Sequence, residues 1–257
     1  MDIVATLTSC VQNNVSCSFS KYGDGEYYCV IKNIGCNCDN DNFSEKKTTG
    51  LINAFKYVTS KGENHFVGMW HDQNIVKFWN QYDDVNNVQW ADYHTFLIDR
   101  KNTNIYEKVL LYKAIKQSSL KKIYVCNPLL GKAKGLLNID TIINVPFNNW
   151  FDTLFDTVFK DIEEQLEPGK QHIIMTSAGM GAKVLIYELM KKYPNNLYFD
   201  LGSALDQLCT KKTSRGWEPS YEHQLYIFKD LLPSDWNDEK YNDIYKEAVT
   251  KLGIHLR

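Results

Sequence analysis

The second half of the chain alternates short apolar runs with longer amphipathic ones. The short runs are rich in β-branched and aromatic residues, and they predict strands over 122–126, 141–145, 172–176 and 197–201. Apolar residues at helical spacing predict helices over 151–166 and 181–193. Strands and helices that alternate over short connections are typical of a parallel sheet with helices on both faces.

The first half of the chain is patterned less regularly. An alternating run from Val15 predicts a strand that stops at Gly23, and a helix is expected from there to about Ile31. The polar segment 33–47 predicts an exposed loop. The remaining expectations are helices over 49–59, 74–81 and 106–115, a strand over 65–69, an apolar run over 95–98 and a helical end beyond Pro233.

No internal repeat, low-complexity segment or linker interrupts these patterns. We therefore expect one α/β domain over residues 1–257, with a Rossmann-like, mostly parallel sheet and helices on both faces.

The composition of the chain argues against some classes of binding partner. Hydrophobic residues make up 44% and charged residues 23% of the 257 residues, which is ordinary for a soluble globular protein. The net charge of -2 and the scattered lysines argue against nucleic acid as a partner. No apolar run has the length of a membrane span, and the N-terminus lacks the features of a signal peptide. We expect a cytoplasmic protein.

Cysteine and histidine give no sign of a metal site in the sequence. The seven cysteines are odd in number and fit neither a disulfide framework nor a closed zinc site, which favours free thiols. The six histidines show no ligand spacing.

The basic residues are strongly biased. The 26 lysines, 3 arginines and 23 asparagines are typical of an AT-rich genome, such as that of a parasite or a large virus. With so few arginines, Arg100 and Arg215 stand out as candidates for bidentate phosphate contacts. A surface position without a special role explains either arginine equally well.

The turn Gly23-Asp24-Gly25-Glu26 is the first candidate site. The two glycines tolerate unusual backbone angles and allow a ligand to approach the main chain. Asp24 and Glu26 can then converge on a hard divalent cation, Mn²⁺ or Mg²⁺. The alternative is that Asp24 only caps the helix that follows.

The second candidate is the small-residue turn over 176–184, between a predicted strand and a predicted helix. Free backbone N–H groups and the helix dipole favour a phosphate at such a turn, and Lys183 adds a positive charge. The alternative is that Ser177 caps the helix while Gly179 and Gly181 allow the helix to pack closely on the strand.

Taken together, these segments resemble a known family. The run Phe-Ser-Lys-Tyr-Gly-Asp-Gly-Glu that ends at Glu26 resembles the signature of the GT-D-fold glycosyltransferases. Segments 145–150, 177–185, 199–206 and 213–217 are similar to later elements of the family and follow in the same order. The chain departs from the family at Lys21, where arginine is usual, so the charge is kept but the bidentate geometry is lost.

The resemblance implies a metal-dependent glycosyltransferase that moves a sugar from a nucleotide-sugar, usually a UDP-sugar, to a glycan or another hydroxyl acceptor. Asp24 and Glu26 would be the catalytic carboxylates that hold Mn²⁺ or Mg²⁺. Asp200 and Asp206, near the end of a predicted parallel strand, are candidates for the general base. The residues expected around the nucleotide are Lys21, Gly23, Arg100, Asn149, Ser177, Ala178, Gly179, Gly181, Lys183, Ser203 and Arg215.

Two other classes of protein remain open. A Rossmann-type enzyme that binds NAD or S-adenosylmethionine would explain Gly179-x-Gly181 and an acid at Asp200, but Val184 replaces the third glycine. A non-catalytic nucleotide- or glycan-binding protein would share the phosphate turn, but it would not require intact Asp24 and Glu26.

Overall fold

A parallel sheet forms the centre of the protein. The computed structural model describes residues 2–99, 104–212, 216–234 and 236. Within these residues seven strands form one sheet in the order β3-β2-β1-β7-β6-β4-β5, and all neighbouring pairs are parallel. The strands are β1 (Cys17–Tyr22), β2 (His65–Met69), β3 (Gln89–Asp92), β4 (Lys121–Cys126), β5 (Thr141–Asn144), β6 (His172–Ser177) and β7 (Leu197–Asp200).

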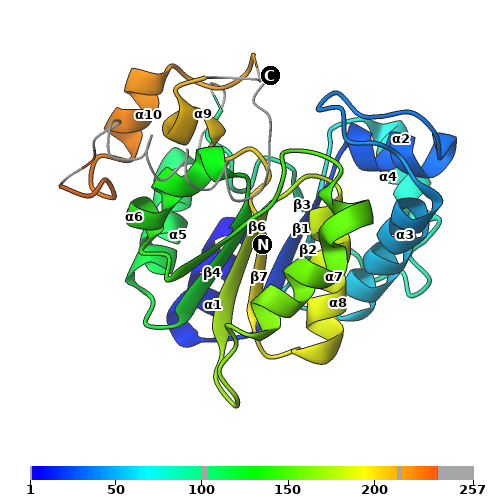
Figure 1. Ribbon diagram of the computed structural model, residues 1–257, viewed down its shortest axis with the longest axis horizontal. Coiled ribbons are helices and arrows are strands. Elements are labelled where there is room, and N and C mark those ends of the chain that lie inside the picture. The colour runs from blue at the N-terminus through cyan, green and yellow to red at the C-terminus, as the bar shows by residue number, and fades with distance from the viewer. Residues whose placement is uncertain (1, 100–103, 213–215, 235, 237–257) are drawn as a thin grey trace.

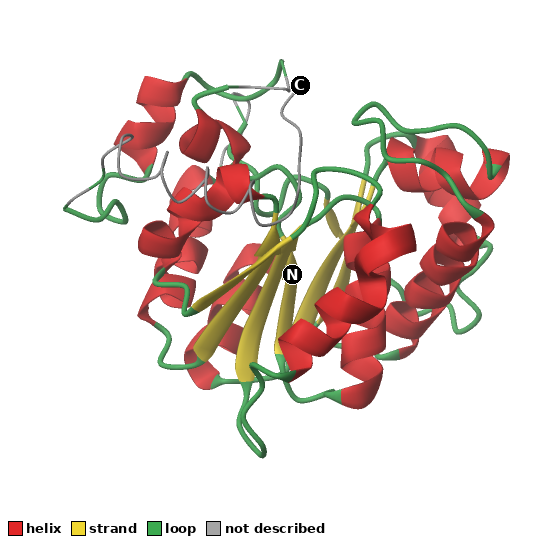
Figure 2. Ribbon diagram, viewed as in Figure 1, coloured by secondary structure: helices red, strands yellow, loops and turns green. Residues whose placement is uncertain are grey.

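Helices cover both faces of the sheet (Figure 2). The core on one face is built with α1 (Ile3–Asn13), α5 (Ile105–Gln117), the 3-10 helix η1 (Pro128–Lys132), α6 (Ala133–Leu137), α9 (Asp206–Thr210) and α10 (Tyr221–Ile227). The core on the other face is built with α2 (Asp24–Lys32), α3 (Glu45–Ser60), α4 (Gln73–Asn80), α7 (Trp150–Glu163) and α8 (Gly181–Lys192).

The central strands are buried on both sides. Ile173 belongs to one core and its neighbour Ile174 to the other, because successive side chains of a strand point to opposite faces. All six residues of β6 are buried, which agrees with the apolar run Ile173-Ile174-Met175 at its centre. The rigid sheet holds the loops at its carboxyl edge, the upper edge in Figure 1, where α2, α9 and α10 lie.

The predicted α/β class and the parallel sheet are confirmed. Six elements were missed in the sequence: α1, β3, η1, α6, α9 and α10. α1 was detectable, since the Asp2 carboxylate caps it by accepting hydrogen bonds from the backbone N–H groups of Val4 and Ala5. β3 is a four-residue strand at the sheet edge with little apolar character, so it gives almost no pattern.

The apolar run 95–98 is a loop rather than a regular element, although Phe96, Leu97 and Ile98 are buried in the core. The helix expected beyond Pro233 lies largely outside the described residues. Within the described part of the chain, none of the helices is both long and apolar enough for a membrane span.

Candidate active-site cleft

A cleft of about 250 Å³ lies at the carboxyl edge of the sheet. Its walls come from the carboxyl ends of the strands and from the loops that follow them, which is where parallel α/β sheets bind ligands. Eight of the residues predicted for the site line it: Lys21, Asp24, Glu26, Ser177, Gly179, Lys183, Ser203 and Asp206.

A buried ionic group forms the floor of the cleft. The Lys183 Nζ lies 2.8 Å from Glu26 Oε1 and 3.0 Å from Asp200 Oδ2. All three side chains are at least nine-tenths buried. Lys183 comes from α8, Glu26 from α2 and Asp200 from the end of β7, so the group joins three elements that are far apart in the chain.

Backbone groups complete this ionic group. The second oxygen of Glu26 accepts a hydrogen bond from the Gly23 N–H at 2.8 Å. The Asp200 carboxylate accepts hydrogen bonds from the backbone N–H groups of Lys21 and Gly202. Each carboxylate oxygen therefore has a partner, as buried charges require.

The charges hold one another in their ionised forms. Burial alone would raise the pKa of Glu26, but the Lys183 ammonium and the Gly23 N–H outweigh it, so the pKa lies below its ordinary value. Burial alone would lower the pKa of Lys183, but Asp200 and Glu26 raise it above its ordinary value. Lys183 is therefore an ammonium over the whole physiological range.

The Gly-Asp-Gly-Glu turn works differently from the expectation. Gly23 is the N-cap of α2 at φ -105°, and neither Gly23 nor Gly25 has a positive φ. Gly23 instead allows a close approach of the Tyr93 ring, since a Cβ there would lie 3.1 Å from it. Glu26, not Asp24, makes the capping interaction. Asp24 is exposed and lines the cleft.

The turn after β6 has the strand–turn–helix form that was predicted. Gly179 adopts φ +61°, which favours glycine. Ser177 does not cap α8; its Oγ accepts a hydrogen bond from the Tyr124 hydroxyl at 2.7 Å. A Cβ at Gly181 would lie 2.8 Å from the Trp150 ring, so this glycine allows α7 and α8 to pack closely.

Several predicted site residues lie away from the cleft surface. The Asn149 side chain accepts a hydrogen bond from the Asn42 N–H at 2.7 Å and so anchors a loop. Asp200 is fully buried beneath the cleft, and Gly23, Ala178 and Gly181 support the surrounding backbone. Arg100 and Arg215 lie outside the described residues.

The sides of the cleft add acidic and aromatic groups that the sequence did not single out. Asp39 and Asp41 come from the loop after α2. Lys47, which is fully buried, fixes this loop through an ion pair of 3.0 Å with Asp41. The aromatic residues of the lining are Trp70, Tyr93, Phe147 and Trp217.

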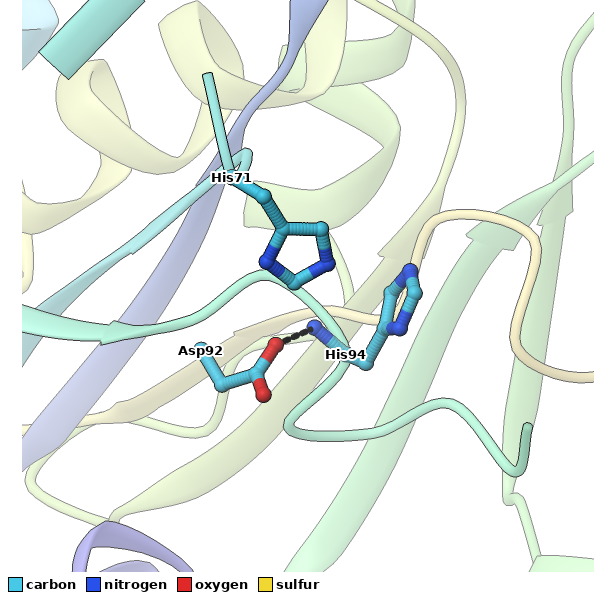
Figure 3. A group of neighbouring side chains, drawn as sticks. All are labelled: His71, Asp92 and His94. Carbon is cyan, nitrogen blue, oxygen red and sulfur yellow. Dashed lines mark hydrogen bonds between the residues drawn. The ribbon is translucent and has the colours of Figure 1, made fainter. Parts of the chain in front are cut away.

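A group of potential metal ligands lies beside these aromatic residues. His71 follows β2, while Asp92 ends β3 and His94 follows it, and one ligand atom from each residue lies within 4.8 Å of the others. Figure 3 shows the two imidazole rings next to each other and the Asp92 carboxylate accepting a hydrogen bond from the His94 N–H, at 2.7 Å.

The expectation of no histidine site was therefore incomplete. Spacing along the chain could not reveal this group, because its members come from two separate loops. The available signal was that both loops follow neighbouring parallel strands, whose carboxyl ends meet at one edge.

Comparisons with known proteins identify the fold. No protein-family model and no curated protein matches the sequence. Two solved structures are similar over nearly the whole chain. One is described as domain of unknown function 1792 with a distinct glycosyltransferase fold; it has 15% sequence identity and a TM-score of 0.57, over 93% of this chain and 92% of its own.

The other is described as a new glycosyltransferase of the same domain type from Streptococcus sanguinis. It has 16% identity and a TM-score of 0.58, over 95% of this chain and 96% of its own. The protein thus has a Rossmann-like fold of the kind described for these glycosyltransferases.

Proposed function

We propose that the protein is a metal-dependent glycosyltransferase that uses a nucleotide-sugar, with a UDP-sugar as the first candidate. The fold shared with glycosyltransferases supports the class of reaction. The observation that carries the proposal is the composition of the cleft, where a strand–turn–helix segment suited to phosphate faces a wall of carboxylates.

The charge of the cleft supports metal dependence. Among its described lining residues are two lysines, Lys21 and Lys183, and five carboxylates: Asp24, Glu26, Asp39, Asp41 and Asp206. Glu26 is paired with Lys183 and Asp41 with Lys47, while Asp24 is exposed. Carboxylate oxygens are the ligands that Mn²⁺ and Mg²⁺ prefer, and a divalent cation would screen a nucleoside diphosphate from the carboxylates of the cleft.

We assign different roles to the two carboxylates of the first motif. Asp24 is exposed at the start of α2, and its carboxylate can bind the cation directly. Glu26 is buried and already paired with Lys183 and the Gly23 N–H, so we assign it mainly to holding Lys183 in place. When bound, the cation would stabilise the negative charge on the departing diphosphate.

The acceptor hydroxyl needs a base if the reaction inverts the sugar. Asp206 is half-buried and lines the cleft, so it is the better candidate of the two predicted bases. Asp200 is unsuitable because it is fully buried and paired with Lys183.

The same observation weakens the alternative of an NAD- or S-adenosylmethionine-binding enzyme. In that class, the acid at the end of the next strand binds the ribose hydroxyls. Here that acid is Asp200, and its oxygens are taken by Lys183 and by the backbone N–H groups of Lys21 and Gly202.

The binding part of the proposal is tested by thermal unfolding. We expect UDP or a UDP-sugar to raise the melting temperature more with Mn²⁺ than after chelation, since a ligand at a hundredfold excess over its Kd stabilises by about 2.7 kcal/mol. A shift with NAD or S-adenosylmethionine, and none with any nucleoside diphosphate plus metal, would contradict the proposal.

The catalytic part is tested by release of UDP from a UDP-sugar, with Asp24→Asn as the variant. Asparagine keeps the size of the side chain and suits a helix start, so the fold should persist. We expect the metal-dependent release to fall by at least about tenfold, because the amide lacks the charge that the cation needs. Binding of UDP without any metal-dependent release by the wild type would indicate a non-catalytic binding protein.

A further inference from the structure

His71, Asp92 and His94 form a separate group at the side of the cleft. His71 and Asp92 are exposed, while His94 is 7% exposed. Trp70 and Tyr93, the neighbours of these residues in sequence, line the cleft. The group is thus next to the proposed substrate site, but it is built on β2 and β3 rather than on β1 and α2.

The ligand atoms of this group have spare bonding capacity. Asp92 Oδ1 accepts the His94 N–H at 2.7 Å, and its Oδ2 has no hydrogen bond to any residue in the described part of the chain. The His71 ring makes aromatic contacts, with Trp70 at 5.3 Å and His94 at 5.3 Å between centroids, and no hydrogen bond within the same set of residues.

His94 supplies the strongest indication. Its Nδ1 lies 2.8 Å from Asp99 Oδ2, so this nitrogen carries the proton when the ring is neutral. Its Nε2 is buried and has no hydrogen-bond partner among residues 2–99, 104–212, 216–234 and 236. A buried polar atom without a partner is costly, and a carboxylate–histidine pair with one free nitrogen is typical of metal-binding histidines.

The surroundings hold the His94 ring in place. Trp217 lies on the His94 ring at 4.7 Å between centroids. Lys108, itself buried, donates hydrogen bonds to the carbonyl groups of His94 and Leu97 and so fixes the loop.

The chemistry of the donor atoms also suits a cation. Two imidazoles and one carboxylate are the donor set of open transition-metal sites, in which water or a substrate completes the coordination.

We propose that His71, Asp92 and His94 bind a divalent transition-metal ion of the zinc or cobalt type at the side of the cleft. At metal–ligand distances near 2.1 Å, tetrahedral ligand atoms are about 3.4 Å apart, and the ligand atoms here all lie within 4.8 Å of one another. Rotation of the exposed His71 and Asp92 side chains can adjust these separations. The site is independent of whether the cleft transfers a sugar.

The test is titration of the chelator-treated protein with Co²⁺, followed by visible absorption and calorimetry. We expect one Co²⁺ per chain to show the bands of a nitrogen- and oxygen-ligated ion and to be displaced by Zn²⁺; an ion held in the cleft by Asp24 would have oxygen ligands alone. His71→Ala and Asp92→Asn should each weaken binding by more than about tenfold, the loss that even outer-sphere changes cause. Neither change removes a buried side chain.

Two controls locate the ion. His223→Ala removes an exposed histidine from α10 and should leave Co²⁺ affinity unchanged. Asp24→Asn, in the proposed nucleotide site, should also retain the Co²⁺ spectrum. Unchanged affinity in His71→Ala or Asp92→Asn would overturn the proposal, as would loss of the spectrum in Asp24→Asn. Thiolate charge-transfer bands would also overturn it, because they would place the ion on Cys36 or Cys38, the exposed cysteines.

Discussion

At the scale of single residues, Lys183 illustrates how burial changes the meaning of a charge. In the sequence it was a lysine in the first turn of a helix, suited to a phosphate. In the structure it is already paired with Glu26 and Asp200 beneath the cleft. The main role of its positive charge is therefore to stabilise the fold. Any attraction of an anionic ligand comes from the combined charges of Lys183, Glu26 and Asp200.

This view gives a prediction for Lys183→Met. Methionine fills a similar volume but leaves the Glu26 and Asp200 carboxylates buried without their cation. We expect the free energy of unfolding to fall by about 3–5 kcal/mol, the usual result of removing one partner of a buried ion pair. Chemical denaturation at pH 7 measures the loss.

The matched control is Lys160→Met. Lys160 pairs with Glu164, but their side chains are 75% and 60% exposed. Removing an exposed pair should change stability by no more than about 1 kcal/mol. Equal effects of the two substitutions would show that the group under the cleft is not energetically buried.

At the scale of elements, the cleft depends on how closely α8 packs against α7. The first residue of α8 is Gly181, where a Cβ would lie 2.8 Å from the Trp150 ring and 3.0 Å from the Cβ of Phe151. Both aromatic residues are buried in the core, so neither can move away freely. The position of Lys183, two residues later, follows from this contact.

Gly181→Ala is therefore expected to destabilise the protein by about 1–3 kcal/mol, the usual cost of overpacking. Gly25→Ala, also in the first turn of a helix, should be neutral or slightly stabilising. Its Cβ would lie 3.5 Å from Asn37, an ordinary contact, and alanine favours a helix by up to about 1 kcal/mol over glycine. Melting temperatures of the two variants compare these effects directly, and a more stable Gly181→Ala would refute the packing argument.

The sequence predicted the positions of helices and strands better than it predicted the contacts between their side chains. β6 was expected over 172–176 and spans His172–Ser177; α8 was expected over 181–193 and spans Gly181–Lys192. Their periodicity is local and strong. The ionic group of Lys183, Glu26 and Asp200 was not predictable in this way, because periodicity identifies elements but not which side chains of distant elements meet. The turn residues were found, but their partners were not.

At the scale of the whole molecule, three histidines with lowered pKa values link stability to pH. Burial lowers the pKa of His65 to about 4, and it also lowers those of His94 and His172. In the unfolded chain, histidine takes up a proton near pH 6.5. As the pH falls below that value, protons bind to the unfolded chain before they bind to these folded-state imidazoles, and the folded protein loses stability.

We therefore predict that the free energy of unfolding decreases from pH 6.5 to pH 4, and that His65→Asn makes this decrease smaller. His65 is the group to replace because its folded-state pKa is the most clearly displaced, and asparagine can keep a hydrogen bond to the Ser18 hydroxyl, now 2.9 Å from His65 Nδ1. His223→Asn, at an exposed position, should leave the pH dependence unchanged. Denaturation midpoints measured at half-unit pH steps give the change of stability with pH. The same change for the wild type and His65→Asn would contradict the prediction, because it would mean that folding does not lower the pKa of His65.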